Sequence, residues 1–205
     1  MKRLLPCLLG YAAGFLSFAF LPSLLAGCAS APRHTQSVPD DAYRAALART
    51  ARPANPGVPA GSDLERAAIA GVTNLFVTYT AEALAKNIPA VYAEDTYFRD
   101  AFKQFDHADQ IKAYMLHGLD PIRSCTFEFE KVLADAGDYF FFWTMVVSFT
   151  SEDEGVVHRS MGASRMRFNE QGKVVFHQDY WDPTDLVWSR VPVAAPLLRW
   201  VKNRL

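Results

Sequence analysis

The sequence predicts a single α+β domain in which helices come first and a long antiparallel sheet follows. Apolar side chains recur at helical spacing from about residue 63 to residue 117. Beyond Cys125 the chain changes to runs rich in Phe, Val and Tyr that are separated by turn sequences. Helices and strands segregated in this way favour a curved sheet that wraps around the helices. The length of 205 residues leaves room for one medium-sized domain.

The first segment has the composition of an export signal. Lys2 and Arg3 precede an uncharged apolar run that extends to Gly27. The run ends in Leu25-Ala26-Gly27-Cys28, which resembles the lipobox of bacterial lipoproteins, where the peptide is cut before a cysteine that becomes lipidated. The alternative is an uncleaved helix, since about 20 apolar residues span a bilayer. We therefore expect residues 1–27 to be a signal peptide, and lipid on Cys28 to anchor the chain on the periplasmic side of the cell envelope.

Residues 28–62 have the composition of a Pro-rich linker. Prolines and glycines accumulate there with little apolar periodicity. Ala42–Arg49 could form a short helix, but it contains too few large apolar residues to anchor one. The folded domain is therefore expected to span residues 63–190.

Three helices and one short strand are expected in the first half of this domain. Ser62 or Asp63 can cap the first helix, and apolar residues at helical spacing extend it to about residue 86. Asp106 is expected to cap the last helix, which runs to about His117. Between them the sequence predicts a short helix over Pro89–Tyr92 and a strand over Thr96–Arg99.

The second half predicts an antiparallel meander followed by one more helix. Turn sequences at residues 135–138 and 169–172 separate aromatic and β-branched runs. Residues 191–205 contain an amphipathic helix over Pro196–Leu205, which could lie on a bilayer surface or pack against the sheet, and the second is favoured because ten residues make a weak anchor. The expected strands are Phe127–Ala134, Tyr139–Thr150, Val156–Asn169 and Lys173–Trp181.

Composition and charge exclude several classes of protein. With 50% hydrophobic and 21% charged residues the chain is neither disordered nor fibrous. A formal net charge of -1 provides no basic field for phosphates, so nucleic acid is not expected as a partner. The 13% aromatic content fits either a dense core or the wall of an apolar pocket.

Two segments carry a recognisable pattern. Phe98-Arg99-Asp100 follows the first helices, and His177-Gln178-Asp179-Tyr180-Trp181-Asp182 ends the last strand. With the order of elements, they resemble the nuclear-transport-factor-2-like superfamily in its SnoaL-like branch over about residues 64–190. The resemblance implies a cone-shaped barrel around an apolar cavity. This superfamily includes ketosteroid isomerases, polyketide cyclases, scytalone dehydratase, limonene epoxide hydrolase and non-catalytic modules, so the fold alone names no reaction.

Strand alternation and the resemblance together predict the wall of a pocket. Residues two apart in a strand share a face. Matching to ketosteroid isomerase turns the row that contains His177, Asp179 and Trp181 toward the cavity. An aromatic and methionine wall with a few polar groups suits a small apolar ligand. The expected lining residues are Tyr79, Trp143, Met145, Ser164, Met166 and Trp181.

The same match assigns candidate catalytic residues. Asp100 falls where the isomerase keeps its general-base carboxylate, and Tyr79 falls close to its oxyanion-hole tyrosine. A carboxylate in an apolar pocket could act as a base near neutral pH. Ser164 stands where the isomerase has a protonated acid, and because a hydroxyl is a weaker donor, steroid isomerisation is not expected.

Asp100, His177 and Asp179 form a second candidate group, in which carboxylates orient a histidine that titrates near neutrality. The structural alternative is that Asp100 caps a turn while His177 and Asp179 satisfy each other or backbone groups. No pair of ligands occurs at helical i, i+4 spacing, so neither a metal nor a cofactor is expected. Cys125 is expected to pack as a small apolar residue.

Three hypotheses about function follow. The first is an exported lipoprotein, tethered to a membrane through its lipid, whose SnoaL-like domain binds a small apolar molecule. The second is a lyase, isomerase or cyclase that uses Asp100 with His177 and Asp179. The third is a non-catalytic module that forms a homodimer through the outer face of the sheet. On that face the arginines of one strand predict a solvated stripe or a protein contact; they are Arg159, Arg165 and Arg167.

Overall fold

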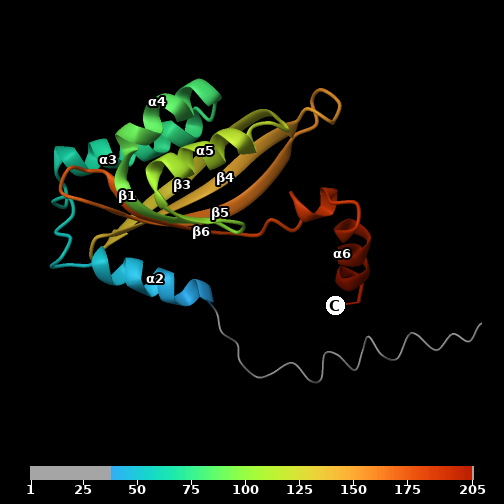
Figure 1. Cartoon of the computed structure of the whole chain (residues 1–205). Helices are drawn as coiled ribbons and strands as arrows, with labels where there is room; N and C mark the ends of the chain where they lie inside the picture. The colour runs from blue at the N-terminus through green and yellow to red at the C-terminus, as the bar shows by residue number, and fades with distance from the viewer. Residues whose placement is uncertain (1–37, 205) are drawn as a thin grey trace, which may run out of the picture. The chain divides into compact units, whose positions relative to one another are not determined.

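The computed structural model describes residues 38–204, and residues 39–205 belong to one compact unit. The predicted signal peptide and Cys28 lie outside the described residues. Four helices of this unit lie against the two sides of a curved sheet (Figure 1). On one side lie α3 (Asp63–Val77), α4 (Ala81–Val91) and α5 (Ala108–Gly118), and on the other lies α2 (Val38–Arg49).

The sheet has six strands among the described residues, in the spatial order β2-β1-β6-β5-β4-β3. The last four in the sequence form the predicted antiparallel meander, while β1 adds in parallel to β6 and β2 pairs antiparallel with β1. The predicted α+β fold is confirmed, although the sheet is open rather than closed into a barrel. The strands are β1 (Tyr92–Arg99), β2 (Gln104–His107), β3 (Ile122–Asp135), β4 (Asp138–Phe149), β5 (His158–Phe168) and β6 (Val174–Trp181).

The single helix predicted over residues 63–86 is wrong, because two helices occupy this region. Ser62 caps α3 as predicted, accepting a hydrogen bond from the backbone of Glu65. Thr80 then starts α4 by accepting one from Ala83, and α4 continues through Pro89. A threonine cap thus interrupts an apolar periodicity that is continuous in the sequence. The break between the helices is where Tyr79 enters the interior.

The capping role predicted for Asp106 is also wrong. Asp106 lies in β2, and the N-cap of α5 is His107, whose side chain makes no capping hydrogen bond. Pairing with β1, in which Phe98 lies opposite Phe105, draws this segment into the sheet. Tertiary pairing therefore overrides a local capping signal.

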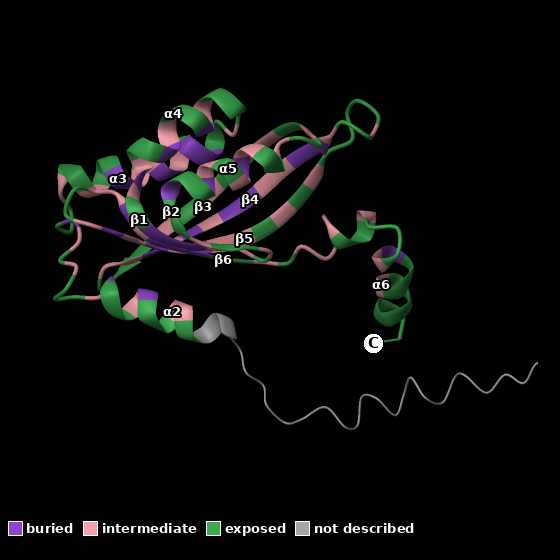
Figure 2. Cartoon of the chain, in the orientation of Figure 1, coloured by how far each residue is buried: buried purple, intermediate pink, exposed green. Residues whose placement is uncertain are grey.

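The core lies between α3, α4, α5 and the concave face of the sheet. Buried side chains of the helices contact aromatic residues of the strands in one continuous cluster. Figure 2 shows the buried positions gathered on the facing surfaces of these elements. The cluster includes Val72, Leu75, Leu84, Ile88, Ile111, Tyr92, Phe98, Phe141 and Phe168.

Part of the predicted linker is folded. Residues 38–49 form α2, and Ala46 is fully buried against Tyr97 and Phe176 on the convex face of the sheet. Farther along, Val58 is buried in the main core, and Asn55 donates a hydrogen bond to the backbone carbonyl of Phe168. The composition of residues 38–49 gives little sign of α2, because its fully buried residue is a small alanine that packs against two aromatic rings.

Two of the three outward arginines are not solvated. Arg165 and Arg167 both pair with Asp138, with nitrogen–oxygen distances of 2.5 and 2.6 Å. They also bind α2, because Arg165 donates to the Tyr43 hydroxyl and Arg167 donates to the carbonyl of Leu47. The predicted solvated stripe is therefore wrong for these two residues. The homodimer predicted on this face stays a prediction, and α2 covers part of that face.

The chain ends in a 3-10 turn, η1 (Trp188–Arg190), and helix α6 (Ala194–Lys202). This helix contacts η1 and buries Ala195, but Leu197 and Trp200 are exposed. The favoured packing of its apolar face against the sheet domain is therefore not found. Within residues 38–204 no helix combines the length and the apolar character that crossing a bilayer requires.

Candidate functional site

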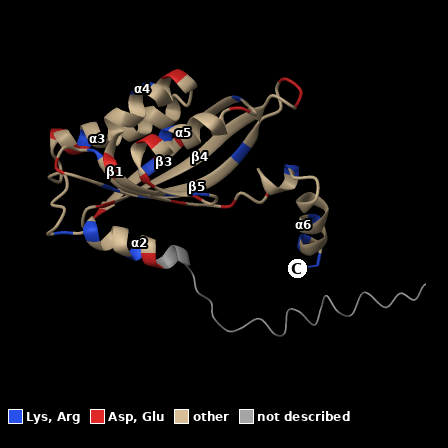
Figure 3. Ribbon diagram, viewed as in Figure 1, with Lys and Arg blue, Asp and Glu red and all other residues tan. Residues whose placement is uncertain are grey.

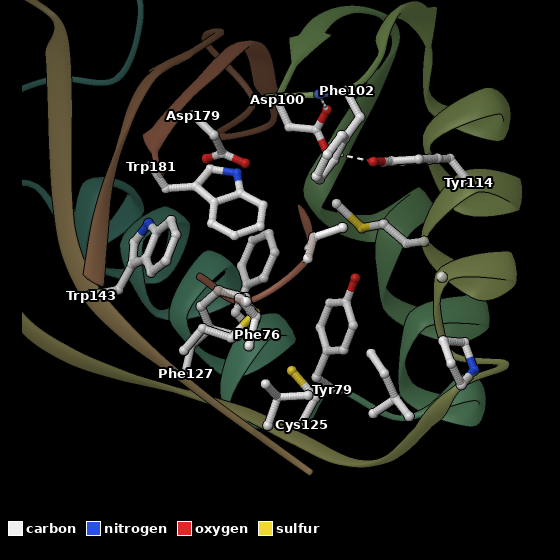
Figure 4. Close-up of a pocket in the computed structure, with 18 of the residues that line it drawn as sticks. Phe76, Tyr79, Asp100, Phe102, Tyr114, Cys125, Phe127, Trp143, Asp179 and Trp181 are labelled. Carbon is white, nitrogen blue, oxygen red and sulfur yellow. Dashed lines mark hydrogen bonds between the residues drawn. The ribbon is translucent and has the colours of Figure 1, made fainter. Parts of the chain in front are cut away.

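A cavity of about 540 Å³ lies between the concave face of the sheet and the helices. Strands β3 and β4 supply the largest share of its wall, α3 and α5 close one side, and the segment after β6 reaches its edge. The lining is mainly aromatic and aliphatic (Figure 4). Among the described residues, the charged ones in this lining are Asp100, Asp179 and Arg190.

One wall of the cavity is a continuous aromatic surface. The rings of Phe76 and Tyr79 stack at 6.1 Å, and Phe127 packs edge-on against both Phe76 and Trp143 at 5.2 Å. Gly162 lies opposite Trp143 in the neighbouring strand, and a Cβ atom there would come within 2.4 Å of the indole. The absence of a side chain at residue 162 therefore allows the indole to lie flat across β5 and donate to Ser164.

Asp179 brings a carboxylate into this apolar wall. Its Oδ1 accepts hydrogen bonds from His177 Nε2 at 2.8 Å and from the hydroxyl of Ser164, which itself accepts one from the indole of Trp143 at 2.9 Å. Its Oδ2 has no hydrogen-bond partner among residues 38–204. The carboxylate is thus held in a fixed orientation by one oxygen and has the other available to a ligand.

His177 lies behind Asp179, away from the cavity surface. It is fully buried, and its Nδ1 lies 2.7 Å from the hydroxyl of Tyr92. Because a carboxylate only accepts hydrogen bonds, Nε2 carries the proton given to Asp179, and Nδ1 accepts from Tyr92 in the neutral ring. Burial raises the pKa of Tyr92 well above its ordinary value, which keeps its hydroxyl protonated as the donor. His177 therefore orients Asp179 and does not itself face a ligand.

Asp100 stabilises a turn at the edge of the same cavity. Its Oδ1 accepts from the backbone nitrogens of Phe102 and Lys103, and its Oδ2 accepts from the hydroxyl of Tyr114 at 2.5 Å. Figure 4 shows Asp100 and Asp179 on the same side of the cavity, with Tyr79 and Cys125 across from them. Both carboxylates thus border one space, but Asp100 has both oxygens engaged and Asp179 has one.

The polar groups across from the carboxylates stay protonated. Burial, with the nearby charges of Asp179 and Asp100, raises the pKa of Tyr79, whose hydroxyl points into the cavity (Figure 4). Burial raises the pKa of the Cys125 thiol to about 12, so this thiol is not a nucleophile at neutral pH. Tyr79 can therefore donate a hydrogen bond to a ligand oxygen, and Cys125 contributes apolar surface.

The segment after β6 forms the mouth of the cavity, and no pattern in the sequence predicted this role. Leu186, Val187 and Val191 line it, and Trp188 packs edge-on against Phe102 at 5.8 Å. Arg190 fixes the segment to the tip of the sheet by contacting Glu152, His158 and the ring of Phe149. Asp182-Pro183-Thr184 is a turn sequence, and a turn sequence does not predict that the following residues will pack over the cavity.

The structure brings most of the expected site residues to one cavity. Tyr79, Trp143, Met145, Ser164 and Trp181 line it, as do Asp100 and Asp179. Met166 does not, because it lies deeper, between Tyr139 and His177 in the paired strands, and is buried in the core. Tyr92 and Tyr114, which hold His177 and Asp100, were not singled out from the sequence. The sequence provided little indication of these roles, because a tyrosine in an apolar run is as typical of the hydrophobic core as of a functional site.

The residues present offer no evident metal site. Within the described part of the chain no group of three or more His, Cys, Asp or Glu side chains could hold a metal ion. The carboxylate of Asp179 is bonded to a histidine and a serine rather than grouped with other ligands. The side chains that line the cavity can form hydrogen bonds with a ligand and exchange protons with it.

Residues 72–177 match the SnoaL-like domain family. This span is just over half of the chain and contains α4, α5, strands β1 to β5 and most of the residues that line the cavity. The chain belongs to the SnoaL-like domain family. No protein of curated function is similar to it in sequence.

Solved structures share the fold at low sequence identity. An NTF2-like protein of unknown function from Burkholderia pseudomallei is 13% identical, with 62% of this chain and 96% of that chain covered and a TM-score of 0.51. A SnoaL-like protein from Shewanella denitrificans, provisionally named a polyketide cyclase, is 14% identical over 60% and 93%, with a TM-score of 0.49. An LEH-like epoxide hydrolase from M. tuberculosis is 10% identical over 68% and 96%, with a TM-score of 0.47. The TM-score of 0.51 to the Burkholderia pseudomallei protein supports a shared fold, and identities this low carry no activity to this chain.

Proposed function

We propose that this SnoaL-like domain binds one small, largely apolar molecule whose polar end lies between Asp179 and Tyr79. The observation that carries the proposal is the cavity of about 540 Å³ with an aromatic wall and few charged groups. Its volume lies within the range of about 300–1,000 Å³ that is typical of small-molecule sites. A carboxylate oxygen and a phenol hydroxyl face this space, so a ligand hydroxyl can donate to one and a carbonyl can accept from the other.

Binding of a neutral apolar probe, N-phenyl-1-naphthylamine, tests this proposal. Its fluorescence rises in apolar surroundings, so titration into the full chain reports occupancy of the cavity. Met145→Trp places a larger side chain in the lining, and we expect it to weaken probe binding by at least about tenfold, equivalent to about 1.4 kcal/mol.

The matched control is Met161→Trp. Met161 is 75% exposed on the outer face of β5, so the same substitution adds surface without filling the cavity. It should bind the probe like the wild type. Equal weakening by both variants, or unchanged binding in Met145→Trp with retained circular dichroism, would contradict binding in the cavity.

A second candidate function is proton-transfer catalysis of the lyase, isomerase or cyclase type. The observation that favours it is the free Oδ2 of Asp179, on a carboxylate oriented by His177 and Ser164 inside an apolar cavity. Such a carboxylate can act as a general base, while the hydroxyl of Tyr79 could stabilise a developing oxyanion. Asp100 would then serve as a positioning group, since both of its oxygens are engaged.

Deuterium exchange into β-tetralone, a ketone with acidic α-protons, tests this candidate. The wild type should accelerate the exchange, and Asp179→Asn should slow it by at least about a hundredfold, as expected for loss of a general base. Asp100→Asn should have a smaller effect. If the wild type exchanges no faster than Asp179→Asn, the catalytic candidate fails while probe binding can still hold.

We also propose that the chain is exported and tethered by a lipid on Cys28. Support comes from the sequence alone, where Lys2 and Arg3, an apolar run and Leu25-Ala26-Gly27-Cys28 follow one another. Mass spectrometry of the membrane fraction should find the mature chain beginning at a diacylglycerol-modified Cys28. Cys28→Ala should keep the full-length mass and lose the modification. An unmodified Cys28 in the wild type would disprove the tether.

A further inference from the structure

We propose that helix α6 binds the surface of an anionic lipid bilayer and thereby holds the mouth of the cavity against the membrane. The helix has two distinct sides. Ala195 is buried and Leu198 is half-buried, and this side packs toward η1. The opposite side presents Val193, Leu197 and Trp200, which are 84%, 61% and 54% exposed.

These apolar residues lie together on the helix surface. Trp200 and Val201 follow Leu197 by three and four residues, which places both beside Leu197 on one stripe of an α-helix. The rest of the described chain leaves Leu197, Trp200 and Val201 exposed, and Figure 2 shows α6 largely exposed. Scattered exposed apolar residues need no explanation, but a stripe that includes a tryptophan on an amphipathic helix is typical of an interfacial helix.

The positive charge of residues 186–205 favours an anionic bilayer as the surface that α6 binds. From Leu186 to Leu205 the sequence contains four basic residues and no Asp or Glu, although the whole chain has a net charge of -1. Arg190 pairs with Glu152 and Lys202 pairs with Asp185, whereas Arg199 and Arg204 form no ion pair among residues 38–204. Figure 3 shows Lys and Arg positions, and no Asp or Glu position, along α6. The guanidinium of Arg204 lies 4.2 Å from the centre of the Trp200 ring, so a cation borders the apolar stripe. A bilayer of anionic lipid matches both the apolar stripe and the cations.

The position of α6 connects this surface to the cavity. The chain passes directly from the mouth residues Leu186, Val187 and Val191 into the helix. Adsorption of α6 would therefore place the mouth at the headgroup level, where an apolar ligand that partitions into lipid could enter. This last step rests on the proposed function, whereas adsorption of α6 does not.

Quenching of Trp200 by brominated lipid tests the adsorption. The full chain is reconstituted into vesicles of phosphatidylcholine with and without phosphatidylglycerol, and the signal of Trp200 is the difference between the wild type and Trp200→Phe. We expect quenching of Trp200 on the anionic vesicles and little on the neutral ones. Arg204→Gln should lower the adsorption constant about fivefold, as expected for one cation at an anionic surface.

Two matched variants distinguish adsorption of α6 from effects of the N-terminal anchor or of misfolding on the quenching of Trp200. Leu197→Glu should abolish the quenching, whereas Met161→Glu, at an exposed apolar residue outside α6, should leave it unchanged. Both keep the N-terminus that inserts the chain. Quenching that persists in Leu197→Glu would overturn the proposal. A second result would also overturn it. If Trp200 becomes less exposed to solvent as the protein concentration rises in the absence of lipid, a second copy of the chain covers the stripe.

Discussion

Asp179 is the residue on which the chemistry of the cavity depends, because the carboxylate is oriented through one oxygen and free at the other. Its orientation comes from a chain of hydrogen bonds that runs from Tyr92 through His177 to Asp179, with Ser164 and Trp143 joining from the other side. The sequence predicted the face on which His177 and Asp179 lie. It could not predict that the histidine would be buried by Phe76 and Phe98, because this depends on how deeply α3 packs.

The pairing of Tyr92 with His177 leads to a prediction about stability. Tyr92→Phe leaves the buried Nδ1 of His177 without a partner and should lower the free energy of unfolding by about 1–3 kcal/mol. In a His177→Phe background the same substitution should cost little, because no polar partner remains. Urea unfolding of the four proteins measures the coupling. Equal costs in both backgrounds would show that the hydrogen bond does not stabilise the fold.

Gly162 leads to a second prediction. Ala at residue 162 would force its Cβ into the indole of Trp143, so Gly162→Ala should destabilise the protein by about 1–3 kcal/mol and push the ring into the cavity. In Trp143→Leu the clash is absent, and Gly162→Ala should then be nearly neutral. Thermal unfolding measures both effects. If Gly162→Ala destabilises the Trp143→Leu protein equally, glycine is needed at residue 162 for its backbone conformation and not for the space it leaves to the indole.

At the scale of elements, sequence patterns succeeded where each element is stabilised by its own residues. The four strands of the meander and their turns follow from local alternation and turn chemistry. The predictions failed where packing decides, as with Thr80, which splits a periodic run, and Asp106, which sheet pairing draws into β2. Helix α2 is the clearest case, since a buried alanine that packs against Tyr97 and Phe176 leaves no signal in composition.

The attachment of α2 can be tested with two neighbouring alanines. Ala46 is fully buried, whereas Ala45 is exposed on the same helix. Ala46→Glu would bury an unpaired charge and should release α2, so that limited proteolysis cuts within residues 38–62. Ala45→Glu should resist proteolysis like the wild type. Equal resistance of both variants would show that α2 is not held by Ala46.

The ion pairs behind α2 lead to a prediction about pH. Burial raises the pKa of Asp138, but the hydrogen bonds from Arg165 and Arg167 outweigh it and bring the pKa below its ordinary value of 3.8. A pKa that is lower in the folded state adds stability above the unfolded value, and this stability is lost as the pH falls through the folded value. The difference in unfolding free energy between the wild type and Asp138→Asn should therefore shrink below about pH 4. A difference that is constant with pH would contradict this account.

At the scale of the whole molecule, the curved sheet, the helices and the C-terminal segment together enclose one apolar space. The sequence predicted its aromatic wall, since Trp143 and Trp181 were assigned the inner face. It did not predict the mouth, because Arg190 reaches Glu152 and His158 across the fold and no local pattern reports such a contact. Proteins that share one fold can catalyse different reactions, so the ligand of this cavity has to be identified by experiment.

The central claim is that this cavity holds a small apolar molecule, and native mass spectrometry of the full chain purified in mild detergent tests it most directly. We predict that the wild type and Met161→Trp retain the same small-molecule adduct with one molecule per chain. Met145→Trp, which narrows the cavity, should lose it. The same occupancy in all three proteins, including none, would contradict the claim.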